Sequence, residues 1–486
     1  MALATLCFGD ILVQGATIID GTGRHGYVAD VRIKGSKIAD IGALRPGPSD
    51  KTVAGHGFVL APGFIDAHSH ADSNLDSLRS QVAQGITTAV VGQDGFNRTP
   101  VFEFFKSLET SPRLMNFACF SGHGSARSRV MGDDYRRRAT SQELLKMKRL
   151  VEKDMKSGAL GLSTGLEYDP GHYSTTEELI VLSRVIAKFG GIYISHMRDE
   201  GNGLEKSVQE LVRIGRQARV HAQISHIKAA TAPVWGKAPR ILDLLERANR
   251  NGVVVTADIY PYSFWQSTVT ALTTSRDFTD PAVWEKALRE TGGADRVTLT
   301  KYSPNKSWEG KTLAVLAQEI SKTPAEVIIE IVQSTRDGRG DESVLCEAMT
   351  EPDIEAFLRW PQTMLCSDGQ GGGTHPRSAG AFPRVLARYV RERKTVSLED
   401  AVRKMTSLPA KTFGLLDRGT IKTGMVADLV LFDPEQIQDN STAAAPTKPP
   451  SGISHVIVNG QIVMVSGVVQ SARPGVAVRR SRSGSN

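Results

Sequence analysis

The chain has 486 residues, of which 40% are hydrophobic and 23% charged, and its net charge is +7. This is the composition of an ordinary globular protein, long enough for one large domain and a smaller one. No apolar stretch reaches the ~18 residues of a membrane span, and part of the positive charge lies in the Ser- and Gly-rich end "VRRSRSGSN". We therefore expect neither a membrane nor nucleic acid as a partner, and we expect Arg479, Arg480 and Arg482 to lie in a disordered tail.

The cysteines favour a reducing compartment. They are Cys7, Cys119, Cys346 and Cys366. Their spacing contains no CxxC motif, which argues against a disulfide framework. The first residues, "MALATLCFGDILVQG", lack a basic region followed by a long apolar segment, so no signal peptide is predicted. A cytoplasmic protein is the expectation.

Short alternating strands separated by turn signals occupy the N-terminal part of the chain, in "DILVQGATIID", "DVRIKGSKIADIG" and "GFVLAPG". The same pattern returns near the other end, in "GTIKTGMVADLVLFD" and "ISHVIVNGQIVMVSG". We expect one small β-sandwich domain built from both termini, residues 1–60 and 415–486.

Between these ends, residues 61–414 alternate short apolar runs with longer amphipathic segments. The runs are "TTAVVG", "NFACFSG", "GALGLSTG", "GIYISH", "AQISH", "VVVTADIY" and "TMLCSDG". Repeated strand–helix units make a parallel sheet. Together with the strand that ends at His70, the runs give about the number needed for an α/β fold of the (β/α)₈ barrel type.

The distance from "DIYPY" to "MLCSDG" is too long for one crossover connection. We therefore expect an inserted subdomain at about residues 274–350, between the last two barrel strands. An insertion at the mouth of a barrel is often a lid.

Residues able to bind a metal or move a proton follow several of these apolar runs. They are His68, His70, Glu167, His196, His226 and Asp368. The carboxyl ends of barrel strands converge on one rim, where active sites lie. Because side chains alternate along a strand, His68 and His70 point the same way. A set of imidazoles favours Zn²⁺ over Mg²⁺ or Ca²⁺.

A carboxylate from Glu167 or Asp94 could bridge two ions, which leaves Asp368 as a base. Each of the two has an alternative use: Glu167 could cap the turn "YDPG", and Asp94 stands in "QDG", a common turn sequence. Isolated histidines are more often structural, and we expect this of His123 and His375.

The quoted motifs resemble a known family. "FIDAHSH", "GITTAVVGQDG", "GLSTGLEYDPG", "YISHMRDEG", "QISHIKAA", "MLCSDG" and "PAKTFGLLDRGTIKTGMVADLVLFD" are similar to the amidohydrolase superfamily and, within it, to the D-aminoacylase (N-acyl-D-amino-acid deacylase) family. The resemblance covers nearly the whole chain. It implies a metal-bearing barrel joined to a small β-sandwich, and hydrolysis of N-acyl-D-amino acids with one or two zinc ions. It also implies that His68, His70, His196 and His226 bind metal and that Asp368 is the catalytic acid/base.

The chain departs from the family at one place. Relatives that resemble it carry a metal-bridging cysteine in "VVGNCG", whereas this chain has "VVGQDG", with Asp94 at that position. Either Asp94 or Glu167 then replaces the thiolate. Glu167 is the preferred bridge, because superfamily members often present a carboxylated lysine or a glutamate at the end of the fourth strand.

An N-acyl amino acid carries a carboxylate, so cationic or hydroxyl groups are expected near the metal. The candidates are Lys228, Tyr260, Tyr262 and Arg377. A cyclic amide hydrolase of the hydantoinase or dihydroorotase type, or a dipeptidase, is the rival activity. A hydantoinase-type site requires a carboxylated lysine where this chain has Glu167, and Lys156 comes too early. A scaffold without catalysis should lack several ligands, whereas this chain has the set. The sequence leaves the oligomeric state open.

Overall fold

The computed structural model describes residues 10–75, 78–97 and 100–481. Cys7, Arg482 and most of the segment read for a signal peptide lie outside these ranges. Within them, Cys119, Cys346 and Cys366 are free, and no helix combines the length and hydrophobicity that crossing a membrane would require.

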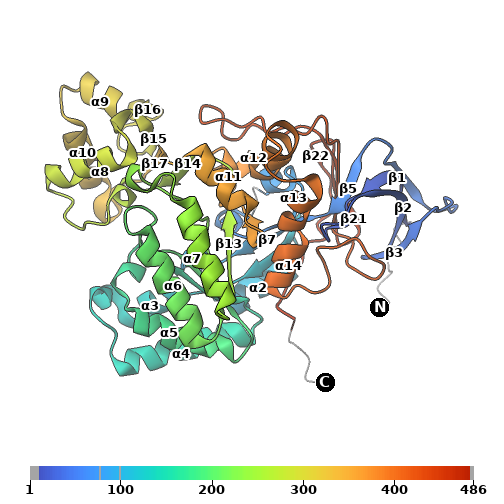
Figure 1. Cartoon of the computed structure of the whole chain (residues 1–486), viewed down its shortest axis with the longest axis horizontal. Coiled ribbons are helices and arrows are strands. Elements are labelled where there is room, and N and C mark those ends of the chain that lie inside the picture. The colour runs from blue at the N-terminus through green and yellow to red at the C-terminus, as the bar shows by residue number, and fades with distance from the viewer. Residues whose placement is uncertain (1–9, 76–77, 98–99, 482–486) are drawn as a thin grey trace.

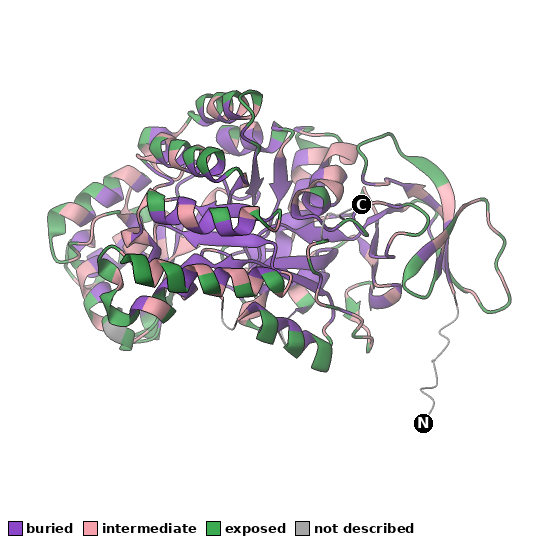
Figure 2. Ribbon diagram, turned by 90° about the horizontal axis from the view of Figure 1, so that it is seen from below, coloured by how far each residue is buried: buried purple, intermediate pink, exposed green. Residues whose placement is uncertain are grey.

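Short, buried parallel strands form the centre of the molecule (Figure 2). One sheet has the order β18-β13-β12-β11-β10-β9 and a second the order β6-β7-β8. The strands are β6 (Phe64–Asp66), β7 (Ile86–Val91), β8 (Asn116–Cys119), β9 (Ser121–Gly122), β10 (Gly161–Gly165), β11 (Ile192–His196), β12 (His221–Ile224), β13 (Val255–Ile259) and β18 (Thr363–Leu365). Their nearly continuous apolar sequences are typical of parallel strands covered on both faces.

Backbone hydrogen bonds join the two sheets at both seams. The amide of Leu160, just before β10, donates to the carbonyl of Cys119 in β8 at 2.9 Å. At the other seam, the amide of Ala67, just after β6, donates to the carbonyl of Leu365 in β18 at 3.2 Å. The carboxyl ends of all these strands therefore face one side of the molecule.

Helices surround the strands and turn their exposed faces outward (Figures 1 and 2). In α7, for example, Ile241, Leu245 and Ala248 are buried while polar residues face solvent. The helices of this region are α1 (Arg79–Val82), α2 (Val101–Thr110), α3 (His123–Met131), α4 (Ser141–Lys156), α5 (Thr176–Ala187), α6 (Leu204–Ala218), α7 (Ala238–Arg250), α11 (Glu351–Arg359), α12 (Arg377–Arg384), α13 (Leu398–Met405) and α14 (Ser407–Phe413).

A separate antiparallel sheet is inserted between β13 and β18, with the order β14-β17-β15-β16. Its strands are β14 (Phe264–Ser267), β15 (Val297–Tyr302), β16 (Lys311–Thr312) and β17 (Glu342–Glu347), and its helices are α8 (Pro281–Thr291), α9 (Leu313–Glu319) and α10 (Pro324–Thr335). It begins at Phe264, earlier than the sequence indicated, because β14 pairs with β17 and belongs to this sheet.

Both ends of the chain contribute to one nine-stranded sheet. The strands are β1 (Ile11–Ile18), β2 (Tyr27–Lys34), β3 (Lys37–Gly42), β4 (Lys51–Ala54), β5 (Val59–Pro62), β19 (Leu429–Phe432), β20 (Ile453–Val458), β21 (Gln461–Val465) and β22 (Val468–Val469). The two sets meet where β5 pairs antiparallel with β19. This sheet and the inserted one lie at opposite ends of the molecule (Figure 1).

The basic tail corrects one expectation. Residues up to 481 are ordered, because the segment pairs with β8: the amide of Val478 donates to the carbonyl of Phe117 at 2.7 Å. The Arg480 guanidinium then donates to the carbonyl of Phe413, and that of Arg479 to Glu109. Prediction of disorder was therefore wrong for these two arginines, which pack against the helices and strands instead.

Candidate metal centre and active site

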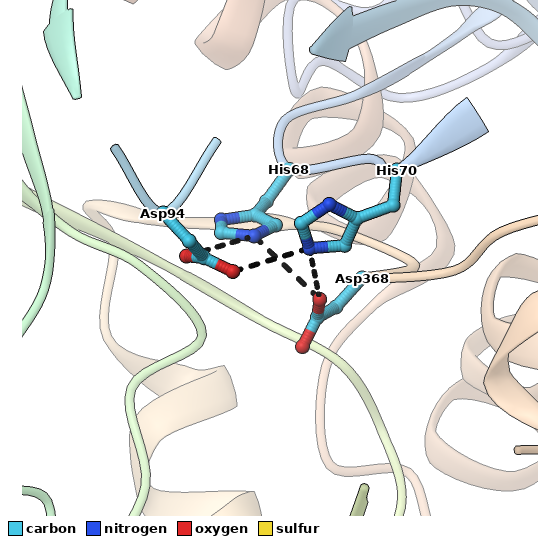
Figure 3. Close-up of side chains that lie close together, drawn as sticks. All are labelled: His68, His70, Asp94 and Asp368. Atoms are coloured by element: carbon cyan, nitrogen blue, oxygen red, sulfur yellow. Dashed lines mark ion pairs between the residues drawn. The ribbon is translucent and has the colours of Figure 1, made fainter. Parts of the chain in front are cut away.

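The first cluster of the site combines two imidazoles with two carboxylates (Figure 3). His70 Nε2 lies 3.2 Å from Asp94 Oδ2 and 3.2 Å from Asp368 Oδ1. His68 Nε2 lies 3.5 Å from Asp94 Oδ1 and from Asp368 Oδ1. These residues come from the ends of β6, β7 and β18, so the strand ends do converge at this point.

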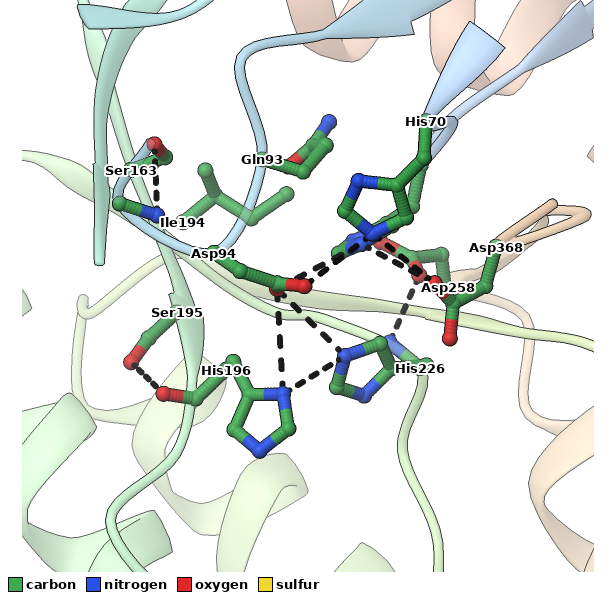
Figure 4. A network of polar contacts seen from close by, with 12 residues as sticks. His70, Gln93, Asp94, Ser163, Ile194, Ser195, His196, His226, Asp258 and Asp368 are labelled. Carbon is green, nitrogen blue, oxygen red and sulfur yellow. Dashed lines mark hydrogen bonds and ion pairs between the residues drawn. The ribbon is translucent and has the colours of Figure 1, made fainter. Parts of the chain in front are cut away.

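The second cluster adds the later histidines to the same aspartate (Figure 4). Asp94 Oδ1 is 3.6 Å from His226 Nε2 and 3.8 Å from His196 Nδ1. The two imidazoles also approach each other, with His196 Nδ1 3.0 Å from His226 Nε2. The carboxylate of Asp94 therefore lies between both histidine pairs.

The backbone is strained at three positions of the site. Asp94, His226 and Asp368 have φ angles of 54°, 35° and 48°, in the left-handed region that non-glycine residues rarely adopt. Such residues cost on the order of 1–3 kcal/mol each and cluster at functional sites. Hydrogen bonds hold two of them: the His226 amide donates to Asp258 Oδ1 at 2.7 Å, and the Asp368 amide donates to the His68 carbonyl at 2.9 Å.

Asp368 is paired with an arginine on its outer side. Its Oδ2 lies 2.6 Å from Arg377 NH1, while Oδ1 faces the histidines. Burial alone would raise the pKa of Asp368, but other effects, of which the charge of Arg377 is the largest, outweigh burial and hold the pKa well below its usual range. Asp368 is therefore ionised and able to accept a proton or bind a cation.

A second buried ion pair lies on the opposite wall. Lys228 Nζ is 2.6 Å from Glu200 Oε2 and 2.6 Å from His226 Nδ1. Sequence reasoning selected Lys228 but missed Glu200, which follows the β11 strand end by four positions, in a loop. Its surrounding sequence, "MRDEG", reads as an ordinary polar loop, and no local pattern there points to a buried carboxylate.

The two tyrosines selected from the sequence occupy different environments. Tyr260 lines the cavity, and its buried hydroxyl has no hydrogen-bond partner in the described part of the chain. Burial raises the pKa of Tyr260 to about 12, so the hydroxyl keeps its proton and can donate it. Tyr262 instead points to Asp439 and Ser441, at 3.3 and 3.4 Å, away from the cavity. The prediction that Tyr262 binds substrate gains no support here, because its hydroxyl contacts Asp439 and Ser441 and it is not among the residues that line the cavity.

A cavity of about 660 Å³ opens over the centre. Its walls combine the strand ends with the inserted segment, including Trp265 of β14, Leu272, and Lys286 and Glu290 of α8. This volume suits a small molecule, and its mixture of apolar and charged walls suits a substrate with both properties.

Comparison with known proteins assigns the chain to a family. A model of the amidohydrolase family matches residues 348–464. D-aminoacylase of Alcaligenes xylosoxydans xylosoxydans is 36% identical over 479 residues, covering 93% of this chain and 93% of that protein.

The chain belongs to the D-aminoacylase family. Two solved structures of D-aminoacylase relatives share its α/β fold. One, a D-aminoacylase solved to define the role of its binuclear metal centre, matches with a TM-score of 0.86 and 33% identity, covering 97% of this chain and 100% of that chain. The other, N-acyl-D-glutamate deacylase of Bordetella bronchiseptica in complex with zinc and a phosphonate mimic of the tetrahedral intermediate, has a TM-score of 0.88, with 32% identity and coverage of 97% and 99%.

Within this D-aminoacylase fold, Glu167 does not lie between the histidine pairs. Its Oε2 is 2.8 Å from His196 Nε2, the ring nitrogen opposite the one that faces Asp94. In the described residues it groups with His196 and Glu200 and not with His68 or His70. Of the two carboxylates considered as a bridge, Asp94 and not Glu167 lies between the two histidine pairs.

The donor atoms fit a metal ion. Both ring nitrogens of His68 and Oδ1 of Asp94 are buried without a hydrogen-bond partner among the described residues. A buried polar atom left in this state costs about 1–3 kcal/mol. Imidazole nitrogen and carboxylate oxygen are ligands that Zn²⁺ accepts. The D-aminoacylase site of this chain is thus built to receive cations.

Proposed function

We propose that this protein hydrolyses the amide bond of N-acyl-D-amino acids and releases a carboxylic acid and a D-amino acid. The observation that carries the proposal is the position of Asp94 between two imidazole pairs, next to an ionised Asp368. Similarity to D-aminoacylase over nearly the full length of both chains supports the substrate class.

We also propose that the two parallel sheets close into one barrel, because hydrogen bonds join them at both seams. The strands β6 to β13 and β18 form a closed (β/α)₈ barrel in which β8 and β9 count as one strand. Hydrogen bonds from Leu160 to Cys119 and from Ala67 to Leu365 across the seams support closure. The terminal sheet is the small β-sandwich domain, and residues 264–347 are the lid-like insertion at the barrel mouth.

Six residues would hold zinc. His68, His70 and Asp368 form one side and His196 and His226 the other, and Asp94 is shared. When bound, zinc lowers the pKa of water toward ~7 and polarises an amide carbonyl. Asp94 replaces a thiolate by a harder oxygen donor, so the centre of this chain contains only nitrogen and oxygen ligands.

The chain's own groups move the proton and hold the substrate. Asp368 accepts a proton from the attacking water and then delivers it to the leaving nitrogen, since an amine leaves slowly unless it is protonated. Arg377 keeps Asp368 ionised and aimed at the histidines. Lys228 and Tyr260 line the cavity and provide an ammonium and a hydroxyl for the substrate carboxylate.

The test compares both enantiomers on metal-loaded protein. Zinc-loaded enzyme should release amino acid from N-acetyl-D-amino acids and much less from the L-forms, while a chelator should stop the reaction and added zinc restore it. Release from none of the D-substrates, with zinc confirmed by elemental analysis, would overturn the proposal.

A further inference from the structure

Glu200 is a buried carboxylate with no role in the reaction described above. It lies in the loop between β11 and α6 and is 5% exposed. A carboxylate at this depth is costly unless charged or polar partners satisfy it. Its hydrogen-bond partners are two residues of the site itself, on the segment that follows β12, and His196 Nε2 lies 3.7 Å from its Oε2.

Each oxygen of Glu200 has its own partner. Oε1 lies 3.1 Å from His226 Nδ1, and Oε2 lies 2.6 Å from Lys228 Nζ. The main chain fixes this arrangement, because the Ala230 amide donates to the carbonyl of Glu200 at 2.9 Å. The loop that carries Glu200 is thereby tied to the segment that carries both partners.

The contact with His226 controls which ring nitrogen is free. A histidine that binds metal through one nitrogen usually donates its other N–H to a carboxylate or carbonyl. His226 Nε2 is the nitrogen that faces Asp94, at 3.6 Å. When Nδ1 donates to Oε1 of Glu200, the proton is on Nδ1 and Nε2 keeps its lone pair for a metal ion.

Lys228 contacts the same ring nitrogen of His226 but favours the other position of the ring proton. Its Nζ is 2.6 Å from His226 Nδ1. An ammonium has only donors, so by itself it would make Nδ1 an acceptor and move the proton to Nε2. Oε2 of Glu200 accepts a hydrogen bond from one N–H of the ammonium and leaves the remaining donors for the substrate.

We propose that Glu200 is a positioning residue with two functions: it keeps Nε2 of His226 free for metal, and it holds Lys228 at the cavity wall for the substrate carboxylate. This inference rests on the proposed function for its second part. Its first part concerns metal binding and stands independently of the substrate.

Metal affinity tests the first part. Glu200→Gln keeps the size of the side chain but replaces one acceptor by a donor, so it cannot serve both partners. We expect it to weaken metal binding by about 10- to 100-fold, measured by competition with a chelator and elemental analysis. Lys228→Met removes the competing ammonium and should bind metal at least as tightly as wild type.

The matched control is Glu205→Gln, which removes a carboxylate from the start of α6 that pairs with Arg240 at the surface. It should leave metal affinity unchanged. Circular dichroism and thermal unfolding check that each variant folds. If Glu200→Gln does not fold, Glu200→Asp replaces it, because the shorter carboxylate cannot reach both partners and should also weaken metal binding.

Steady-state kinetics test the second part. At saturating metal, Glu200→Gln and Lys228→Met should both raise KM for an N-acetyl-D-amino acid about tenfold, with kcat changed less than KM. A folded Glu200→Gln variant with wild-type metal affinity overturns the first part, and unchanged KM in both variants overturns the second. Wild-type protein that loads metal but cleaves no such substrate refutes the proposed function and leaves the metal comparison valid.

Discussion

The two histidine pairs of the metal centre have different surroundings. Glu167 contacts the ring nitrogen of His196 that faces away from Asp94. Glu200 contacts the corresponding nitrogen of His226. The ring nitrogens of His68 have no hydrogen-bond partner in the described part of the chain. The later pair is thus oriented by carboxylates before a metal binds, whereas no hydrogen bond among the described residues orients the ring of His68.

The difference in surroundings should give the two sides of the centre different affinities for a metal ion. Carboxylates behind an imidazole fix its orientation and strengthen it as a ligand. An ion held by His196, His226 and Asp94 should therefore be retained more tightly than an ion at His68 and His70. The earlier pair adjoins Asp368, so the more loosely held side is also the side with the proton-transfer group.

The largest effect should come from the base. Asp368→Asn keeps the shape of the side chain but cannot accept a proton, so kcat should fall by about 10²–10⁴-fold. Bound metal, measured by elemental analysis, should remain mostly intact because the histidines and Asp94 persist. Complete loss of metal together with activity would instead make Asp368 mainly a ligand.

Removing the shared carboxylate should disturb both pairs together. Asp94→Ala is expected to weaken metal binding on both sides by at least about tenfold, a cost of roughly 1.4 kcal/mol or more per ion. Asp94→Cys supplies a thiolate that can also bridge and should retain both ions. Elemental analysis after dialysis measures the outcome. An Asp94→Ala variant that keeps one ion fully would show that the pairs are independent.

A substitution at Glu167 tests whether the later histidine pair holds its ion more tightly than the earlier pair. Glu167→Gln should weaken the ion on the later side about tenfold, while the earlier side is unchanged. Wild-type protein should lose its ions to a chelator in two steps. In the variant these two steps should occur at more similar chelator concentrations. A variant with the same two steps as wild type would mean that the carboxylate behind His196 has no effect on the ion.

The smallest effect concerns the inserted sheet. Burial raises the pKa of Glu342 in β17 to about 7, although the Val269 amide partly offsets it. The folded state therefore binds more protons than the unfolded state between pH ~4.5 and ~7, and this group's contribution to stability falls as pH rises through that range. Above about pH 7 the loss is complete.

Glu342→Gln should accordingly raise the melting temperature relative to wild type at pH 8 and have little effect at pH 5. Thermal unfolding at the two pH values measures this difference. Glu347→Gln, at an exposed position of the same strand, is the matched control. If the temperature of inactivation changes with pH in the same way as the melting temperature, the inserted sheet and the metal centre unfold as one cooperative unit.

The sequence predicted the ends of the strands better than their connections. Strand ends at His68, His196 and His226 could be recognised, because buried parallel strands have continuous apolar sequences followed by polar residues. The start of the insertion at Phe264 could not, since β14 pairs with β17 far along the chain and short-range patterns do not report long-range pairing.

Site residues could be predicted where they directly follow a strand, and less well where they lie in loops. Glu200 was missed because a loop brings it back toward the site. Tyr262 was selected as a hydroxyl group near the metal, and its contacts with Asp439 and Ser441 could not be foreseen because those residues are about 180 positions away in the sequence. The choice between Asp94 and Glu167 needed three-dimensional distances, since both follow strands and both carry carboxylates.

The pairing of β5 with β19 affects how the protein is made. The first strands leave the ribosome long before the strands that complete their sheet. At ~5–20 residues per second, synthesis of 486 residues takes roughly 20 to 100 s. During that interval the unpaired edge of β5 must avoid neighbouring nascent chains, so the yield of active protein in a cell should depend on chaperones and on the rate of translation.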